Sequence, residues 1–417
     1  MLRTGEQYRE SIRDGRNVWV DGKKVDDVPN HPAFKPIVDI RARIYDMAHE
    51  KQFAEKLSYI DENTNERNCI GSKLPKTQKD WSLKREAIKT IMYEIGAVVT
   101  RVGDETAGEM WSLYDGTDIL NEVDPRFGKN IATHIQKVLK EDIFHVSANT
   151  DPKGDRSKLP QDQDPDMLLH AVEENDKGIV VKGAKYETAA AYANQAFVKP
   201  TIANWGDQKL SNYALGFICP MNAPGLKHIC RSGFAGKSDP EDYPLSNRAD
   251  EVDTLLVFDN VLIPWEDVLF YQHTKAATFI RGTLHRYSAL AFVERILHMA
   301  DLMIGTALHN VRQTGLEHQQ AVREKLATLI CYREGINAHL TAAIANAGGQ
   351  SYWVIFQLLL VTPSSCPDPL KQTPKQQRVS PSHRDQCEVR NHQADHLYYR
   401  SLRMEFCQPQ FLLAPHQ

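Results

Sequence analysis

Two histidines and one arginine are candidates for proton transfer and anion binding in this chain. His145 and His285 each carry an imidazole, which has an ordinary pKa of about 6.5 and can accept a proton at pH 7. Arg101 keeps its positive charge in a protein and can hold an oxyanion. The same residues also fit structural roles, as an arginine near a helix C-terminus, a strand-end histidine and a histidine at a helix N-terminus.

Several common catalytic signatures are absent from the sequence. The chain contains no GxGxxG after a strand, no GxxxxGK[ST] and no GxSxG. This argues weakly against a tightly held nicotinamide dinucleotide, and against ATP chemistry and a serine nucleophile. An oxidative enzyme of this kind must receive its electrons from elsewhere.

The sequence gives no convincing metal site. His392 and His396 have the i, i+4 spacing of one helix face, but no acidic third ligand lies nearby. The seven cysteines are scattered and form no CxxC pair, so neither a zinc ribbon nor a disulfide framework is indicated. We therefore expect no metal.

The composition is that of an ordinary globular protein. The 417 residues include 50 basic and 54 acidic side chains, a balance that gives no electrostatic case for nucleic acid or an anionic membrane. The charged N-terminus lacks the apolar core of a secretory signal. The longest apolar run, Val354–Val361, is interrupted by Gln357 and is far shorter than the roughly 20 residues of a membrane span. We therefore expect a cytoplasmic protein.

The elements that must position the candidate residues follow a helix, sheet, helix order. Residues 1–140 carry a hairpin at Asn17–Val25 with an Asp-Gly turn, then helical apolar spacing over Ile37–Ala48 and Leu83–Val99. A β-rich part follows, with a loop at Thr150–Asp166, and the helical period returns from about Thr283 to Ala347. Its predicted strands include Gly178–Val181, Tyr213–Ile218 and Thr254–Phe258. This order indicates an α+β fold.

One stretch, Glu241–Phe270, is specific as a string. It reads EDYPLSNRADEVDTLLVFDNVLIPWEDVLF and predicts a buried strand at Thr254–Phe258, a turn at Asp259–Asn260 and an apolar run ended by Pro264–Trp265. DYPLS-R followed by FDNVLIPWEDVL resembles the middle domain of the oxygenase component of two-component flavin-dependent aromatic hydroxylases. That family includes the 4-hydroxyphenylacetate 3-monooxygenases and the chlorophenol and nitrophenol monooxygenases. The resemblance covers about residues 3–345.

The resemblance implies an acyl-CoA dehydrogenase-like fold. We expect an N-terminal helical domain at residues 1–140, a middle β-barrel-like domain at 141–278 and the start of a C-terminal helical bundle at 279–347. Beyond residue 347 the content of Pro, Gln, Ser and Arg rises and periodicity is lost, so 348–417 is predicted to be a disordered or frame-shifted tail. Family members continue with helices there, so the bundle is expected to be truncated; a divergent C-terminal domain is the alternative.

The resemblance also implies a reaction. Enzymes of this family hydroxylate a phenol with O2 and reduced FAD, which a separate flavin reductase supplies as a diffusible co-substrate. They are cytoplasmic homotetramers of aromatic catabolism and use no metal. Such a reaction needs an acceptor for the phenol proton, a cation for the phenolate and a dry site. The substitution of the phenol stays open.

Three residues take catalytic roles in this resemblance. Arg101 occupies the arginine position of the family motif G-R-T-P-D, here T-R-V-G-D, and Glu105 stands where the 4-hydroxyphenylacetate enzymes have a tyrosine. His145, in IFHVSANTDPKGDRS, matches the histidine of F-N-H-x-x-x-N-P-P-x-D-R, which contacts the phenol oxygen. His285, in T-L-H-R-Y-S-A-L, matches the first histidine of L-H-Y-H-A-L, a segment that supplies the base in the chlorophenol and nitrophenol enzymes; Tyr287 replaces the second.

The same resemblance implies flavin contacts. Asn149 keeps the family spacing from the preceding histidine, and Asp155 and Arg156 match the D-R pair after a two-residue insertion. In the family the loop that they form touches the flavin. Thr188, in GAKYETAAAYANQ, is the candidate for a threonine beneath the isoalloxazine ring, although the alignment places Ala189 at that position.

Two other interpretations stay open. One is a truncated, non-catalytic homologue, whose apolar helix faces, such as Leu284–Ile304, lose their partners and associate with other surfaces. The other is an acyl-CoA dehydrogenase-like enzyme or CoA-ester dehydratase of the same fold. Those dehydratases ligate an iron–sulfur cluster partly through a C-x3-C pair, which this chain lacks.

Overall fold

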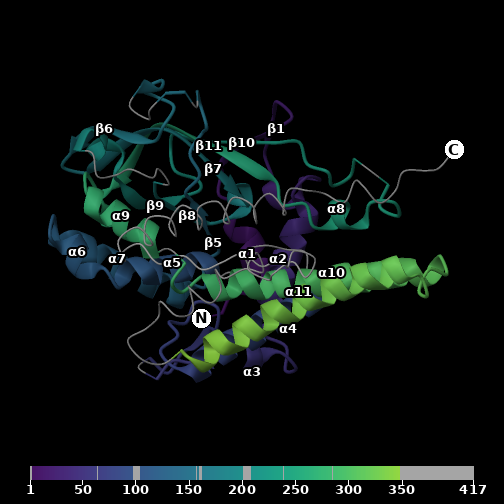
Figure 1. Ribbon diagram of the computed structural model, residues 1–417. Helices are drawn as coiled ribbons and strands as arrows, with labels where there is room; N and C mark the ends of the chain where they lie inside the picture. Colours follow the sequence, from purple (N-terminus) through teal and green to yellow (C-terminus); the bar gives the residue numbers. More distant parts are fainter. Residues whose placement is uncertain are drawn as a thin grey trace, which may run out of the picture.

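Two β-sheets lie among helices from both ends of the chain (Figure 1). The computed structural model describes residues 2–62, 64–96, 104–155, 157–158, 162–200, 208–237, 239–283 and 285–347, with backbone only for 104 and 208–210. The tail predicted for 348–417 lies outside these residues, as do His392 and His396.

The N-terminal part is mainly helical, as the apolar spacing predicts. The predicted helix Ile37–Ala48 is confirmed as α2, and the one at Leu83–Val99 corresponds to α4, which begins earlier because Thr77 caps it. Helix α4 ends where Gly96 takes a left-handed conformation (φ 91°). The helices are α1 (Gly5–Ser11), α2 (Lys35–Met47), α3 (Ala54–Leu57), α4 (Gln78–Ile95), α5 (Asp104–Tyr114), α6 (Thr117–Asn121) and α7 (Pro125–Glu141).

The described strands form a six-stranded sheet (β2-β1-β10-β11-β7-β6), a four-stranded sheet (β12-β9-β8-β5) and a small β3-β4 pair. The predicted N-terminal hairpin is confirmed, and its strand β1 joins the large sheet by pairing in parallel with β10. The strands are β1 (Asn17–Val20), β2 (Lys23–Val25), β3 (Ser58–Ile60), β4 (Arg67–Cys69), β5 (His145–Ala148), β6 (His170–Asn175), β7 (Gly178–Thr188), β8 (Gln195–Val198), β9 (Gly216–Pro220), β10 (Leu226–Cys230), β11 (Asp253–Pro264) and β12 (Val268–Phe270).

Two sequence predictions in this region are wrong in detail. The turn expected at Asp259–Asn260 is a β-bulge, because β11 stays paired with the long strand β7 and only its register shifts, with Asn260 at φ 55°. The strand expected at Tyr213–Ile218 begins only at Gly216, since Tyr213 ends a 3-10 helix. Neither change alters which face of the sheet is buried.

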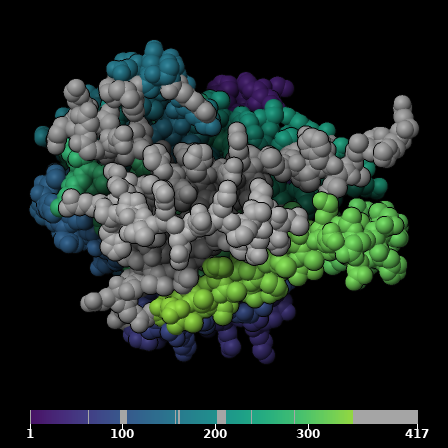
Figure 2. Space-filling model, viewed as in Figure 1, coloured from purple at the N-terminus to yellow at the C-terminus, as the bar shows by residue number. Residues whose placement is uncertain are grey.

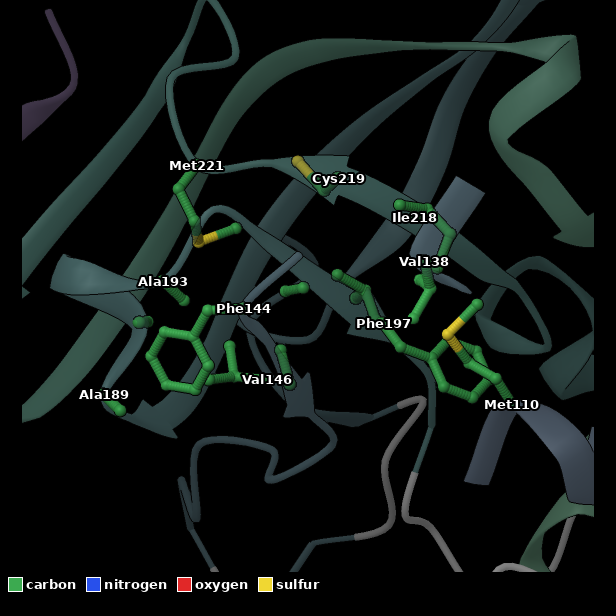
Figure 3. Close-up of a cluster of buried hydrophobic side chains, with 14 of the residues drawn as sticks. Met110, Val138, Phe144, Val146, Ala189, Ala193, Phe197, Ile218, Cys219 and Met221 are labelled. Carbon is green, nitrogen blue, oxygen red and sulfur yellow. The ribbon is translucent and has the colours of Figure 1, made fainter. Parts of the chain in front are cut away.

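A buried apolar cluster joins the sheets to the helices (Figure 3). Phe144 and Val146 point into this cluster, while Phe197 of β8 lies beside Met110 of α5 and Val138 of α7. Because neighbouring residues of a strand face opposite sides, His145 and Ser147 of β5 face away from Val146. The packing of the core therefore fixes the direction of one candidate histidine.

The C-terminal helices form a long hairpin of α10 against α11 (Figure 1). Its near end packs on α4, and its far end projects from the body of the molecule (Figure 2). The sequence suggested that His285 lies in the first turn of helix α10. This helix begins at Ala289, however, so His285 lies in the turn before it. The helices are α8 (Pro244–Arg248), α9 (Thr274–Thr283), α10 (Ala289–Gln313) and α11 (Gln320–Ala345). None of the described helices combines the length and apolar composition needed to cross a membrane.

Replacement of Gly183 by alanine should destabilise the large sheet. Gly183 lies in β7 at φ 125°, and an added Cβ would be 2.5 Å from the carbonyl oxygen of Leu168. We expect a loss of about 1–3 kcal/mol in the free energy of unfolding, measured by urea denaturation. Gly282→Ala is the control, because Gly282 is exposed in helix α9 and has no atom within 4 Å of the new Cβ. An equal loss in both variants would contradict this account of the strand.

Candidate active site

The described catalytic candidates lie on two segments that each pack against helix α5, strand β5 and the turn before α10. His145 begins β5 and is 2% exposed, and Ser147 follows it on the same face. Helix α5 covers this face, with Met110 packed beside Phe197 of the neighbouring strand. The imidazole of His145 is therefore enclosed by protein at the helix–sheet interface.

A buried lysine connects β5 to α5. Lys199, which directly follows β8, donates a hydrogen bond from Nζ to Glu109 Oε2 (2.6 Å) and another to Ser147 Oγ. Its ammonium lies 4.5 Å from the centroid of the Phe197 ring. The side chains of Lys199 and Glu109 are 2% and 8% exposed. Because a buried charge without a partner is strongly destabilising, each of these two residues requires the other.

The turn that carries His285 lies directly against α5. At Gly108 an added Cβ would be 2.8 Å from the carbonyl carbon of Tyr287, so only glycine permits this approach. Tyr287 donates a hydrogen bond to Asp115 Oδ2 (2.6 Å) and stacks on Trp81 with a centroid distance of 6.3 Å. Contacts with α4 and α5 thus hold the turn in place.

The surroundings of His285 keep its imidazole neutral. Desolvation of the partly buried ring lowers the pKa of His285 below its usual 6.5; the carboxylates of Glu109 and Glu105 oppose this effect, and the ammonium of Lys199 adds to it. The ring Nδ1 lies 3.3 Å from Ser288 Oγ. A neutral imidazole at pH 7 is suited to accept a proton.

The second carboxylate of α5 is also paired. Glu105 lies 2.8 Å from Nε of Arg295, a buried residue of α10. Glu105 and Glu109 are one helical turn apart, and each receives a cation from a different element. At the position where the 4-hydroxyphenylacetate enzymes have a tyrosine, this chain therefore has a carboxylate, Glu105, whose negative charge is compensated by Arg295.

The predicted catalytic residues have different outcomes. Arg101 lies outside the described residues. His145 and His285 both lie on segments that pack against α5. Lys199 is related to both, because it bonds to Ser147, close to His145 in β5, and its charge acts on His285. The catalytic role of each residue stays a prediction.

Two of the predicted flavin contacts lie on adjacent segments. Asn149 follows β5 and Thr188 ends β7, and the two strands are joined by a bridge between Thr150 and Tyr186. The hydroxyl of Thr188 donates to Asp253 Oδ1 (2.8 Å), a bond that favours a structural role for this threonine.

The other two predicted flavin contacts are in the loop after Asn149. Arg156 lies outside the described residues. Asp155 is exposed and accepts hydrogen bonds from the backbone N–H and the hydroxyl of Ser157, which lower the pKa of its carboxyl. Its carboxylate is therefore engaged in a local turn.

An open pocket of about 330 Å³ lies beside this loop, on the outer face of the six-stranded sheet. Strand register places Trp19, Ile229, Leu255 and Tyr186 in one row across four strands of this face. Tyr186 is 44% exposed and Ile229 43%, which is unusual for large apolar side chains. The pocket lies at the lower end of the size range of small-molecule sites, and the flat apolar surface fits a planar ring system.

Sequence reasoning missed the central pair of this site. Glu109 stands in the apolar helical run AGEMWSLY, and Lys199 directly follows the buried strand QAFV. A charged residue in such a setting is the signal that could have found them, because charges are rarely buried without a partner. Their pairing, across 90 positions, has no local signature.

Two family models match the chain. The model described as 4-hydroxyphenylacetate 3-hydroxylase N terminal matches residues 4–270, and the one described as 4-hydroxyphenylacetate 3-hydroxylase C terminal matches residues 274–362. The chain belongs to the 4-hydroxyphenylacetate 3-hydroxylase family. The predicted family is therefore confirmed.

Named relatives give the same result. The 4-hydroxyphenylacetate 3-monooxygenase oxygenase component of Thermus thermophilus is 29% identical over 366 residues, 85% of this chain and 73% of the relative. The oxygenase component of 4-nitrophenol 2-monooxygenase from a Rhodococcus species is 33% identical over 341 residues, 79% of this chain and 63% of the relative. The chain thus spans about two thirds of the length of these proteins.

A solved structure confirms the fold. The oxygenase component (HpaB) of 4-hydroxyphenylacetate 3-monooxygenase, complexed with FAD and 4-hydroxyphenylacetate, superposes with a TM-score of 0.79 at 29% identity. The match covers 86% of this chain and 75% of that one. The α+β fold with helices before and after the sheets is therefore the fold of this family, as predicted.

Gly108→Ala should displace the His285 turn from α5. The new methyl group would overlap the backbone of residues 287 and 288, so the turn must move or the helix must shift. We expect faster hydrogen exchange in a peptide covering 285–288, measured by mass spectrometry, and a loss of about 1–3 kcal/mol in stability. Gly335→Ala is the matched helical control, because nothing lies within 4 Å of its new Cβ. Unchanged exchange at 285–288 in Gly108→Ala would disprove the close contact.

Proposed function

We propose that this protein is the oxygenase component of a two-component aromatic monooxygenase, which hydroxylates a phenol with O2 and reduced FAD from a separate flavin reductase. The observation that carries the proposal is the close packing of the turn that bears His285 against α5 at Gly108, next to two carboxylates of α5 that are each paired with a cation. The relatives support it, since those reported above are named as oxygenase components acting on phenols. Which phenol this protein uses is left to experiment.

The proposed acid–base work falls to the two histidines. His285 accepts the proton of the phenol hydroxyl, because its imidazole is neutral at pH 7. His145, enclosed on β5, holds the phenol oxygen. The ammonium of Lys199 is already bonded to Glu109, so Arg101 stays the proposed cation for the phenolate. The enclosing protein keeps water from the reacting ring.

The proposed flavin site is the outer sheet face beside the loop after β5. Thr188 and the exposed Tyr186 lie at this face, Asn149 directly precedes the residue bridged to Tyr186, and Asp155 and Arg156 remain proposed contacts. Reduced FAD, when bound, supplies the electrons that reduce O2 to the oxygen added to the ring. The exposed apolar row on the sheet gives the ring system of a flavin a surface on which to stack.

The remaining predictions follow from the family and are part of this proposal. They are a homotetrameric assembly, a cytoplasmic location, a role in aromatic catabolism and independence from metals. Within the described residues no group of three or more His, Cys, Asp or Glu side chains is arranged to hold a metal ion.

The direct test is oxygen transfer from labelled dioxygen. We expect the purified full chain, given chemically reduced FAD and 18O2, to add one labelled oxygen to at least one of 4-hydroxyphenylacetate, 4-nitrophenol and a chlorophenol. Mass spectrometry of the product measures the label, and a peroxide assay measures uncoupled oxygen. If FAD binds but hydrogen peroxide accounts for all oxygen consumed with every phenol, the protein is a non-catalytic homologue.

His285→Gln should remove the base. We expect the rate of hydroxylation to fall by about 10²- to 10⁴-fold, because glutamine cannot accept the phenol proton. The wild-type rate should hold through pH 7 and fall only well below pH 6.5, since the pKa of His285 is lowered and the neutral form is active. In His285→Gln this acid limb should be absent.

The matched control is His273→Gln. His273 directly precedes α9 and is buried, and its Nε2 lies 2.8 Å from the carbonyl oxygen of Ile119 in α6. This variant should lose stability and keep the wild-type pH profile. If His285→Gln retains both the rate and the acid limb, His285 is not the base.

A further inference from the structure

The Glu109–Lys199 pair lies next to the turn that carries His285. Gly108, where an added Cβ would be 2.8 Å from the backbone of this turn, is the immediate neighbour of Glu109 in helix α5. Lys199 reaches Glu109 from the end of β8 and is held there by Ser147 as well. Two opposite charges from two different elements therefore lie near this turn, and both act on the imidazole of His285.

Other described charged groups near the His285 turn are also paired. Glu105 of α5 is bound to Arg295 of α10, and Arg286 of the turn itself donates to Asp115, which directly follows α5 (2.9 Å). Tyr287 shares the same carboxylate. Within the part of the chain that the structure describes, a change to one partner of such a pair exposes the field of the other.

We propose that Glu109 and Lys199 are positioning residues that set, by opposed charges, how readily His285 accepts a proton. The proposal rests on the proposed role of His285 as the base. When the phenol proton moves to His285, an imidazolium forms in a partly buried place, and the carboxylate of Glu109 stabilises it. Lys199 opposes that effect, so the resting imidazole stays neutral and the proton is not held too tightly for release.

A purely structural role would not require ions at this place. Replacing a buried ion pair by apolar residues of similar volume is often neutral or stabilising, so attachment of β5 to α5 does not by itself explain the pair. The two roles differ in one measurable respect. A structural pair gives the same kind of loss when either partner is removed, whereas opposed charges shift the titration of His285 in opposite directions.

The test is a histidine titration by NMR on full-length protein labelled with 13C at histidine Cε1, with the His285 signal assigned from His285→Gln. We expect Lys199→Met to raise the midpoint of the His285 titration by about one pH unit, because a cation is lost and a carboxylate is released. Glu109→Gln should lower it by a similar amount, since only the cation remains. Lys199→Arg should restore the wild-type value, and the double variant K199M/E109Q should lie near it.

Lys185→Met provides a matched control. Lys185 and Asp151 form another buried pair, with side chains 3% and 12% exposed, and neither acts on His285. This variant should lose stability as Lys199→Met does, with the His285 midpoint unchanged. If Lys185→Met shifts the midpoint as Lys199→Met does, the effect is a general result of unfolding and the proposal fails.

The acid limb of hydroxylation should move with the NMR midpoint. Equal directions of shift in Lys199→Met and Glu109→Gln, or no rise in Lys199→Met, would overturn the proposal. If Glu109→Gln unfolds before His285 titrates, Lys199→Met and its arginine rescue decide the matter alone. If the two variants shift the His285 midpoint in opposite directions but the protein hydroxylates no phenol, the role of the charge pair is supported and the proposed function is rejected. If the protein hydroxylates a phenol but neither variant shifts the midpoint, the proposed function is supported and the role of the charge pair is rejected.

Discussion

The arrangement of this site depends on the burial of two carboxylates on one face of helix α5. An ionised carboxylate removed from water is strongly unfavourable unless a cation and hydrogen bonds compensate it. Helix α5 offers no cation of its own on this face, so Lys199 must come from the end of β8 and Arg295 from α10. The requirement for charge compensation therefore ties the sheet, the N-terminal helices and the C-terminal hairpin to one another, with His285 between them.

Local sequence predicts much of this arrangement, but it does not predict the ion pair at its centre. Apolar spacing located α2, α4 and the C-terminal helices, and the Asp-Gly turn located the β1–β2 hairpin. The Asp259–Asn260 pair predicted a turn, because such residues tolerate a positive φ; the partner strand β7 kept the chain in the sheet and made the same conformation a bulge. The Glu109–Lys199 pair could not be predicted, since it forms only after the helix and sheet have packed.

The resemblance named histidines that the structure could place, but it gave no reason for their protonation state. That reason is physical and lies in residues outside the recognised motifs. Gly108 lets the His285 turn touch α5, and Tyr287, which departs from the family pattern, anchors the turn to Asp115. In the sequence, Tyr287 looks like the loss of a second histidine. In the structure, it holds the turn that carries the first histidine, His285.

The acid–base residues and the proposed flavin face are connected by one short strand. His145 begins β5 and Asn149 follows its end, so about 13 Å of extended chain separates the two groups. The C-terminal half of this strand and the loop after it are held in place: Ser147 is bonded to the buried Lys199, and the loop is attached to β7 through the Asp151–Lys185 pair. A change at either anchor should therefore displace the proposed phenol-binding residue His145 relative to the proposed flavin face, and the proposed hydroxylation depends on that relative position. For this reason, substitution of an anchor residue should first increase uncoupled oxygen consumption. Binding of the phenol and of FAD should change less.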